Sequence, residues 1–68
     1  MEIFTLSEDY IELSKLLKSL GLCTTGGIAK NAIENGQVIV DGKVEYRKGC
    51  KIRQGQTVEF DDHFIEVN

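Results

Sequence analysis

Proline and tryptophan are absent from the 68-residue sequence, histidine occurs once and cysteine occurs twice. No hydrophobic run approaches the roughly 18 residues that a membrane-spanning helix needs. Residues 1–4 read Met-Glu-Ile-Phe, so the start lacks the basic and apolar regions of a signal peptide. We therefore expect a cytoplasmic protein without a membrane partner.

The few side chains suited to metal or redox chemistry do not form a recognisable site. Cys23 and Cys50 are not arranged as C-x-x-C, and we expect both to be reduced thiols. His63 follows Asp61 and Asp62 at a predicted turn, where adjacent polar residues are usually solvated. A structural zinc ion needs four ligands. We predict no metal site and no cofactor.

The short length limits the chain to a single domain, which we place over residues 1–68. The sequence offers no Ser/His/Asp or Cys/His arrangement for nucleophilic catalysis, and Gly26-Gly27 is not part of a P-loop motif. An enclosed substrate cleft must be surrounded by protein on most sides, and so short a chain has too few residues to form one. We predict that the protein is not an enzyme and takes no small-molecule substrate.

Acidic and basic side chains are segregated along the sequence. The formal net charge is −3, yet residues 1–12 and residues 59–68 each carry four acids and no base. Residues 43–53 carry five bases and one acid. The chain is therefore acidic at both ends and basic in the middle. This pattern fits either an ordinary mixed surface or a surface for a polyanionic partner.

The N-terminal third predicts a short strand followed by an amphipathic helix. Residues 2–6 favour the strand, and residues 7–9 (Ser-Glu-Asp) break it and can cap the helix. The helix is expected from about Ile11 or Glu12 to Leu20, and Gly21 should end it. Its apolar stripe has i, i+3, i+4, i+7 spacing and consists of Leu13, Leu16, Leu17 and Leu20. At about 100° per residue, Lys15 and Lys18 project from the opposite side.

A second helix is predicted from about residues 24–27 to Asn35. A threonine supplies the N-cap oxygen, and Gly36 ends the helix. The expected buried face consists of Ile28, Ala29, Ala32 and Ile33. The expected solvent side consists of Lys30, Asn31 and Glu34.

Everything after Gly36 predicts strands and tight turns. Asp41-Gly42 is a strong hairpin signal, and Gln54-Gly55 and Asp61-Asp62 mark further turns. The strands are expected at residues 37–40, 43–46, 57–60 and 64–67, and the basic loop within residues 47–53 leads into a further short strand. We predict an α+β fold with an N-terminal strand, two packed helices and then a small antiparallel β-sheet.

Two features indicate a surface that could bind phosphate. At the start of the second helix, Thr25-Gly26-Gly27 combines unpaired backbone amides, a partly positive helix end and a hydroxyl donor, although a simple capped turn is the alternative. Basic side chains from distant segments would also merge into one strip if the helices pack against one end of the sheet, and such a strip attracts phosphates whatever the net charge. The candidate nucleic-acid contacts are Lys15, Lys18, Thr25, Gly26, Gly27, Lys30, Asn31, Arg47, Lys48, Lys51 and Arg53.

Aromatic rings contribute little to this candidate surface. The five rings are expected mostly at core positions, and they are Phe4, Tyr10, Tyr46, Phe60 and Phe64. Tyr46, beside Arg47, is the one ring that we consider for contact with a base. The surface would therefore recognise backbone shape and charge more than sequence.

Several motifs resemble, in order and spacing, those of S4-like RNA-binding domains, in particular short stand-alone bacterial members. They are L-x-x-L-L-K-x-x-G-L at residues 13–22, T-G-G-x-A-K at 25–30, G-x-V-x-V-D-G at 36–42, R-K-G-x-K-I at 47–52 and G-x-x-V at 55–58. The resemblance covers roughly residues 11–60. It implies two helices, the αL motif, packed on a small sheet, with RNA held along the helical pair and the adjoining loop.

Carried over residue by residue, the resemblance indicates Lys30 and the Arg47-Lys48-x-x-Lys51 cluster as the first contacts, with Lys15 and Lys18 next. Larger members carry arginine or lysine at the start of the second helix. This chain has Gly26 there, which leaves only backbone amides to hold a phosphate.

The predicted function is binding of structured RNA, ribosomal or otherwise highly folded, by a protein taken as a monomer. The alternative is a protein-interaction module whose basic strip binds an acidic partner. A ubiquitin-like sulfur carrier is excluded, because the chain ends in Glu66-Val67-Asn68 and not in Gly-Gly.

Overall fold

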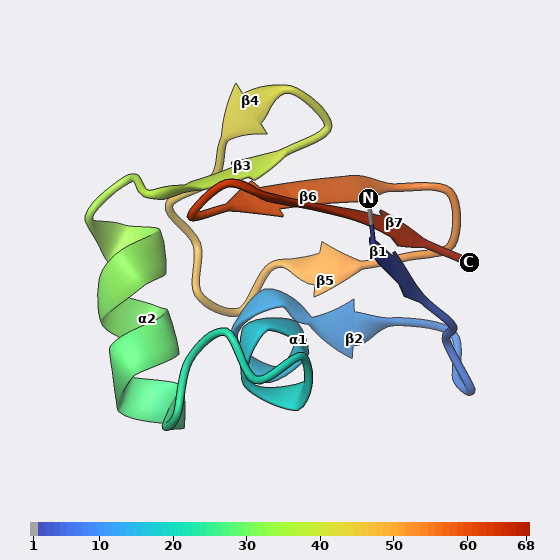
Figure 1. Cartoon of the computed structure of the whole chain (residues 1–68), viewed down its shortest axis with the longest axis horizontal. Coiled ribbons are helices and arrows are strands. Elements are labelled where there is room, and N and C mark those ends of the chain that lie inside the picture. Colours follow the sequence, from blue (N-terminus) through green and yellow to red (C-terminus); the bar gives the residue numbers. More distant parts are fainter. Residues whose placement is uncertain (1) are drawn as a thin grey trace.

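The computed structural model describes residues 2–68, which form two helices and seven strands (Figure 1). In chain order these elements are β1 (Glu2–Phe4), β2 (Ile11–Glu12), α1 (Leu13–Ser19), α2 (Gly26–Glu34), β3 (Val38–Val40), β4 (Lys43–Val44), β5 (Lys51–Ile52), β6 (Thr57–Phe60) and β7 (His63–Val67). The α+β prediction is confirmed. Within the described residues, neither helix has the length and apolar character needed to cross a bilayer.

The main sheet has the strand order β1-β7-β6-β3-β4. The late strands pair antiparallel, as the turn signals predict, with Val40 opposite Val58 and Val58 opposite Ile65. β1 joins the edge of this sheet beside β7 in parallel, so the sheet is mixed. Figure 1 shows both helices on the same side of the sheet.

The short strand expected after the basic loop forms as β5, but its pairing with β2 in a two-stranded ribbon was not expected from the sequence. Ile11 and Glu12, predicted as the first helical turn, instead pair with Ile52 and Lys51. The helix therefore begins at Leu13, whose amide donates to the carbonyl of Cys50 at 2.8 Å. This backbone bond replaces the side-chain cap expected from residues 7–9, since the N-cap residue Glu12 makes no capping hydrogen bond.

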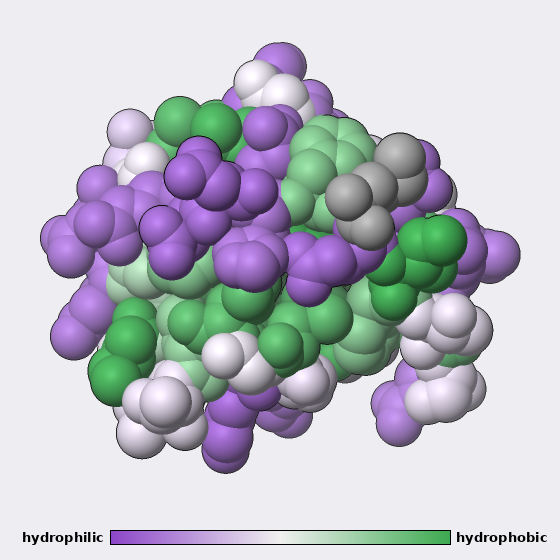
Figure 2. Space-filling model, viewed as in Figure 1, coloured by the Kyte–Doolittle hydropathy of each residue, from purple (hydrophilic) through white to green (hydrophobic). Residues whose placement is uncertain are grey.

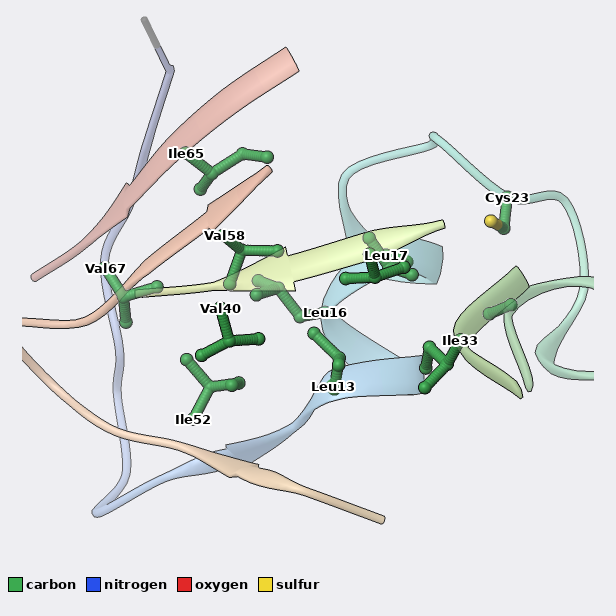
Figure 3. Packing of buried hydrophobic residues seen from close by; sticks show 12 residues of the cluster. Leu13, Leu16, Leu17, Cys23, Ile33, Val40, Ile52, Val58, Ile65 and Val67 are labelled. Atoms are coloured by element: carbon green, nitrogen blue, oxygen red, sulfur yellow. The ribbon is translucent and has the colours of Figure 1, made fainter. Parts of the chain in front are cut away.

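The hydrophobic core lies between the helices and the sheet (Figure 3). Leu13, Leu16 and Leu17 from α1 are fully buried, as the leucine spacing predicts. They meet the alternate side chains of the strands that face the helices, including Val38, Val58, Ile65 and Val67. Ile52 of β5 is also fully buried, so the small ribbon is part of the core.

The face of α2 that is buried is narrower than expected. Ala29 and Ile33 are fully buried, and Ala32 is nearly so. Ile28, which we expected on the same face, has 51% of its surface exposed. About 100° separates Ile28 from Ala29 around the helix, which places Ile28 at the flank of the stripe.

The prediction that the aromatic rings mostly occupy the core is wrong for three of the five. Phe4 and Phe60 are half-buried against the core. Tyr10, Tyr46 and Phe64 are exposed, because β4 ends before Tyr46, Tyr10 precedes the β2–β5 ribbon, and Phe64 lies on the alternate face of β7 from buried Ile65.

The predicted turns form with left-handed backbone, and two of them show what that backbone does. Gly36, after α2, has φ +77°, and a Cβ added there would lie 3.1 Å from Cε1 of the Tyr46 ring. Asp41 and Gly42 both have positive φ, as the turn of the β3–β4 hairpin requires. The Asp41 carboxylate also accepts from Nε2 of Gln56 at 2.8 Å and from the amide of Thr57 at 2.9 Å, which ties the hairpin to β6 and lowers the pKa of Asp41.

Gly36→Ala and Gly42→Ala form a matched pair. Both glycines have left-handed backbone, with φ of +77° and +82°, but a Cβ added at Gly42 would meet nothing within 4 Å. Both substitutions should lower the free energy of unfolding by about 1–2 kcal/mol through left-handed strain. Gly36→Ala should cost more, since the Tyr46 ring must also move. Urea unfolding measures the difference, which should vanish when both variants also carry Tyr46→Ala. An equal cost for the two variants in the wild-type background would contradict the contact.

Candidate nucleic-acid interface

Lysines from three separate segments meet at a hollow beside the helices. The hollow has a volume of about 450 Å³ and is open to solvent. We call it the lysine hollow, and its lining residues are Glu12, Ser14, Lys15, Lys18, Gly26, Lys30, Lys48 and Gly49.

The core packing explains why these lysines converge. Leu13, Leu16 and Leu17 point into the core, so Lys15 and Lys18 project away from it. The small side chain of Ala29 allows α2 to approach α1 closely, and its neighbour Lys30 is left on the exposed side. The loop between β4 and β5 supplies Lys48.

Two of these lysines have acidic neighbours. Lys15 Nζ lies 3.4 Å from Glu12 Oε1, and Lys48 Nζ lies 3.5 Å from Glu34 Oε2. All four side chains are at least 40% exposed, and ion pairs of this kind contribute only about 0–1 kcal/mol. Among residues 2–68, Lys18 and Lys30 form no ion pair. Solvated phosphates could therefore reach all four lysines at little cost.

The start of α2 has the cap that the sequence predicts. Thr25 Oγ1 accepts from the amide of Ile28 at 3.1 Å. A Cβ added at Gly26 would meet nothing within 4 Å, and one at Gly27 would meet only Thr25 Oγ1 at 3.8 Å. Packing inside the protein therefore does not require these glycines. Of the candidate contacts in this segment, Gly26 lines the lysine hollow, and Thr25, Gly27 and Asn31 are exposed but do not line it.

Arg47 does not line the lysine hollow. Its guanidinium donates from Nε to Glu45 Oε2 and from Nη2 to Glu45 Oε1, both at 3.0 Å, and its backbone amide also donates to Glu45. The side-chain bonds from Arg47 are the largest cause that lowers the pKa of Glu45 to about 2. Arg47 lies instead in a separate hollow with Lys43 and Lys51.

Lys51 and Arg53 gather over an aromatic ring. Lys51 Nζ lies 4.9 Å and Arg53 Cζ 5.4 Å from the centroid of Tyr10. The β2–β5 register explains this arrangement, because the pairing of Ile11 with Ile52 brings Tyr10 next to Arg53. Tyr10 was not among the predicted contacts, because no signal in the sequence indicates the pairing of β2 with β5. Tyr46, the ring considered for base contact, has 62% of its surface exposed and lines neither the lysine hollow nor the Tyr10 cluster.

The side chains with metal or redox chemistry are dispersed in the structure. Residues 2–68 contain no group of three or more potential metal ligands. His63 is the first residue of β7, and its Nδ1 lies 2.6 Å from Oε2 of Glu2. Cys23 and Cys50 are free thiols, and burial raises the pKa of each.

Residues 4–68 match the S4 domain family. The two helices on a small mixed sheet agree with this match. The chain belongs to this family. It is 50% identical over 68 residues to YbcJ of Escherichia coli strain K12, which is named a candidate RNA-binding protein, and equally to YbcJ of Shigella flexneri, which carries no functional description. In both cases the match covers 98% of this chain and 97% of the relative.

The solution structure of E. coli YbcJ superimposes on this fold with a TM-score of 0.74, covering 98% of this chain and 86% of that one. That structure is described as revealing an αL motif involved in RNA binding. The α1–α2 pair of this chain is the corresponding helical motif.

The Glu45–Arg47 pair predicts a specific pH dependence. Because the pKa of Glu45 falls from 4.5 to about 2 on folding, its stabilising effect is complete above pH 4.5 and is lost as the pH falls towards 2. The free energy of unfolding should therefore drop more steeply over this window in the wild type than in Glu45→Gln. Glu8→Gln is the control, because Glu8 is exposed and outside every ion pair of residues 2–68. Parallel pH profiles for the wild type and Glu45→Gln would refute the assignment.

Proposed function

We propose that the protein is a non-catalytic RNA-binding protein that holds structured RNA through phosphate contacts at the lysine hollow. The observation that carries the proposal is the convergence of Lys15, Lys18, Lys30 and Lys48 from α1, α2 and the β4–β5 loop. These lysines are up to 33 residues apart in sequence, and only the fold brings them together.

The overall negative charge does not oppose this function. Phosphate binding depends on the local field and on release of the counterions condensed on RNA, and each lysine that neutralises a phosphate contributes to that release. Of the acids, Glu12 lines the hollow and Glu34 pairs with Lys48. Many of the others lie in β1, β6, β7 and the adjoining turns, including Glu2, Glu59, Asp61, Asp62 and Glu66.

Structured RNA fits this surface better than a flexible strand. Lys15, Lys18 and Lys30 extend from two packed helices, so the spacing of their stems is fixed by the core. A fixed set of cations selects a backbone whose phosphates are already held at matching positions, as in a folded RNA. The name and description given to E. coli YbcJ support RNA as the partner. Ribosomal RNA is the leading target among such RNAs, with the protein acting as a monomer.

A salt titration with charge-removing variants tests the proposal. Four phosphate contacts predict a slope of about −2.8 to −3.6 for log affinity against log salt, from roughly −0.7 to −0.9 per contact. The double variant Lys18→Gln/Lys30→Gln should weaken binding to an RNA hairpin and make the slope shallower by about 1.4 to 1.8. Fluorescence anisotropy of a labelled hairpin measures both quantities.

Lys43→Gln, compared with Lys18→Gln and Lys30→Gln singly, is the charge-matched control, because Lys43 is exposed and lies outside the lysine hollow. It should change the affinity and the slope little. An absence of binding at low salt, or equal effects of the double variant and the control, would refute the proposal. Cellular partners that survive nuclease treatment would instead favour the acidic-protein alternative.

A further inference from the structure

We propose that a second hollow, adjoining the lysine hollow, takes the base of an unpaired nucleotide, with Tyr10 as its aromatic wall. The inference rests on the proposed function, since the nucleotide would belong to the RNA held by the lysines. It adds recognition of single-stranded elements to a surface that otherwise contacts phosphates.

The second hollow is open to solvent, and its lining combines apolar and aromatic side chains with charged ones, among them Glu8, Lys15 and Lys18. Its volume is about 600 Å³, within the range of roughly 300–1,000 Å³ that is typical of small-molecule clefts. Phe4, Leu6 and Ile11 provide half-buried apolar surface, and Tyr10 provides an aromatic ring with 38% of its surface exposed. We call this feature the Tyr10 hollow.

Apolar surface is open to solvent in this part of the molecule. Figure 2 shows a band of apolar surface across the middle of the view, between the polar surface of the sheet and that of the helical side. In the same view of Figure 1, β1 and α1 lie on either side of this region. The apolar part of the hollow's lining favours the flat face of a base, and its lysines favour the phosphate beside that base.

The two hollows share part of their walls. Lys15 and Lys18 line both of them, together with Glu12. A phosphate bound by these lysines would therefore stand at the boundary, with one neighbouring nucleotide over the lysine hollow and the other over the Tyr10 hollow. This continuity connects the base site to the phosphate site.

Two cations lie over the Tyr10 ring. Lys51 and Arg53 are exposed, lie 4.9 Å and 5.4 Å from the ring centroid and orient the ring by cation–π attraction. Their charges are available to the phosphate that follows the inserted base. Lys51 and Arg53 lie outside the lysine hollow, and in this proposal they contact a phosphate of the same RNA.

Only an unpaired base can enter such a hollow. In a helix the bases are stacked and paired, and the A-form major groove is too deep and narrow for side chains to read. Loops and bulges present splayed bases that stack on aromatic side chains. A hairpin should therefore use both hollows, whereas a blunt duplex should use the lysine hollow alone.

The test compares a hairpin with the blunt duplex of its own stem, each binding to the wild type, Tyr10→Ala and Tyr10→Phe. Tyr10→Ala should lower the affinity for the hairpin by roughly five- to 150-fold, as expected for loss of one stacking partner, and should leave duplex binding nearly unchanged. Tyr10→Phe should retain hairpin affinity, because it keeps the ring. Circular dichroism checks that each variant is folded.

A direct measurement does not depend on the alanine variant. The chain has two tyrosines and no tryptophan, so in a Tyr46→Phe protein the emission comes from Tyr10 alone. Hairpin RNA should quench this emission strongly by stacking, and the duplex should quench it much less. Equal quenching by the two RNAs, or equal losses of hairpin and duplex affinity in Tyr10→Ala, would overturn the inference.

The outcomes also separate this inference from the proposed function. If Lys18→Gln/Lys30→Gln weakens both RNAs while Tyr10→Ala affects neither, the lysine hollow stands and the Tyr10 hollow fails. If the wild type binds neither RNA at low salt, both proposals fail together.

Discussion

The leucine stripe of α1 is the interaction on which the rest of the structure depends. Leu13, Leu16 and Leu17 are fully buried, and they fill the space between α2 and the helix-facing side of the sheet. These three leucines are the large side chains that α1 buries in the core, so the stripe fixes the rotation of α1 about its axis. The same rotation turns Lys15 and Lys18 outward beside Lys30. Core and candidate interface are therefore two faces of one seven-residue helix.

The features predicted from the sequence were those encoded locally. These features depend on residues close together in the chain, and they appear in the structure. They are the helix periodicity, the Thr25 cap and the turns at Gly36, Asp41-Gly42 and Asp61-Asp62. The parallel pairing of β1 with β7 and the antiparallel pairing of β2 with β5 join segments some 40 to 60 residues apart. Such short strands carry no periodic pattern that specifies a distant partner.

The candidate site shows the same division between local and distant information. The sequence identified the lysines but not how they are grouped, because grouping depends on the packing of α1, α2 and the β4–β5 loop. Arg47 lies close to Lys48 in sequence, yet its bonds to Glu45 hold it outside the lysine hollow. Tyr10 showed no distinguishing pattern, and its neighbours Lys51 and Arg53 come from β5 and its end.

The parallel pairing of β1 with β7 has a consequence for biosynthesis. The amide of Leu6 donates to the carbonyl of Asn68, and the amide of Asn68 donates to the carbonyl of Phe4. As the polypeptide emerges from the ribosome, β1 is made first but has no strand to bond to until β7 has left the exit tunnel. The edge of the sheet can therefore close only after translation of this domain has finished, and a nascent chain halted before β7 would leave β1 unpaired.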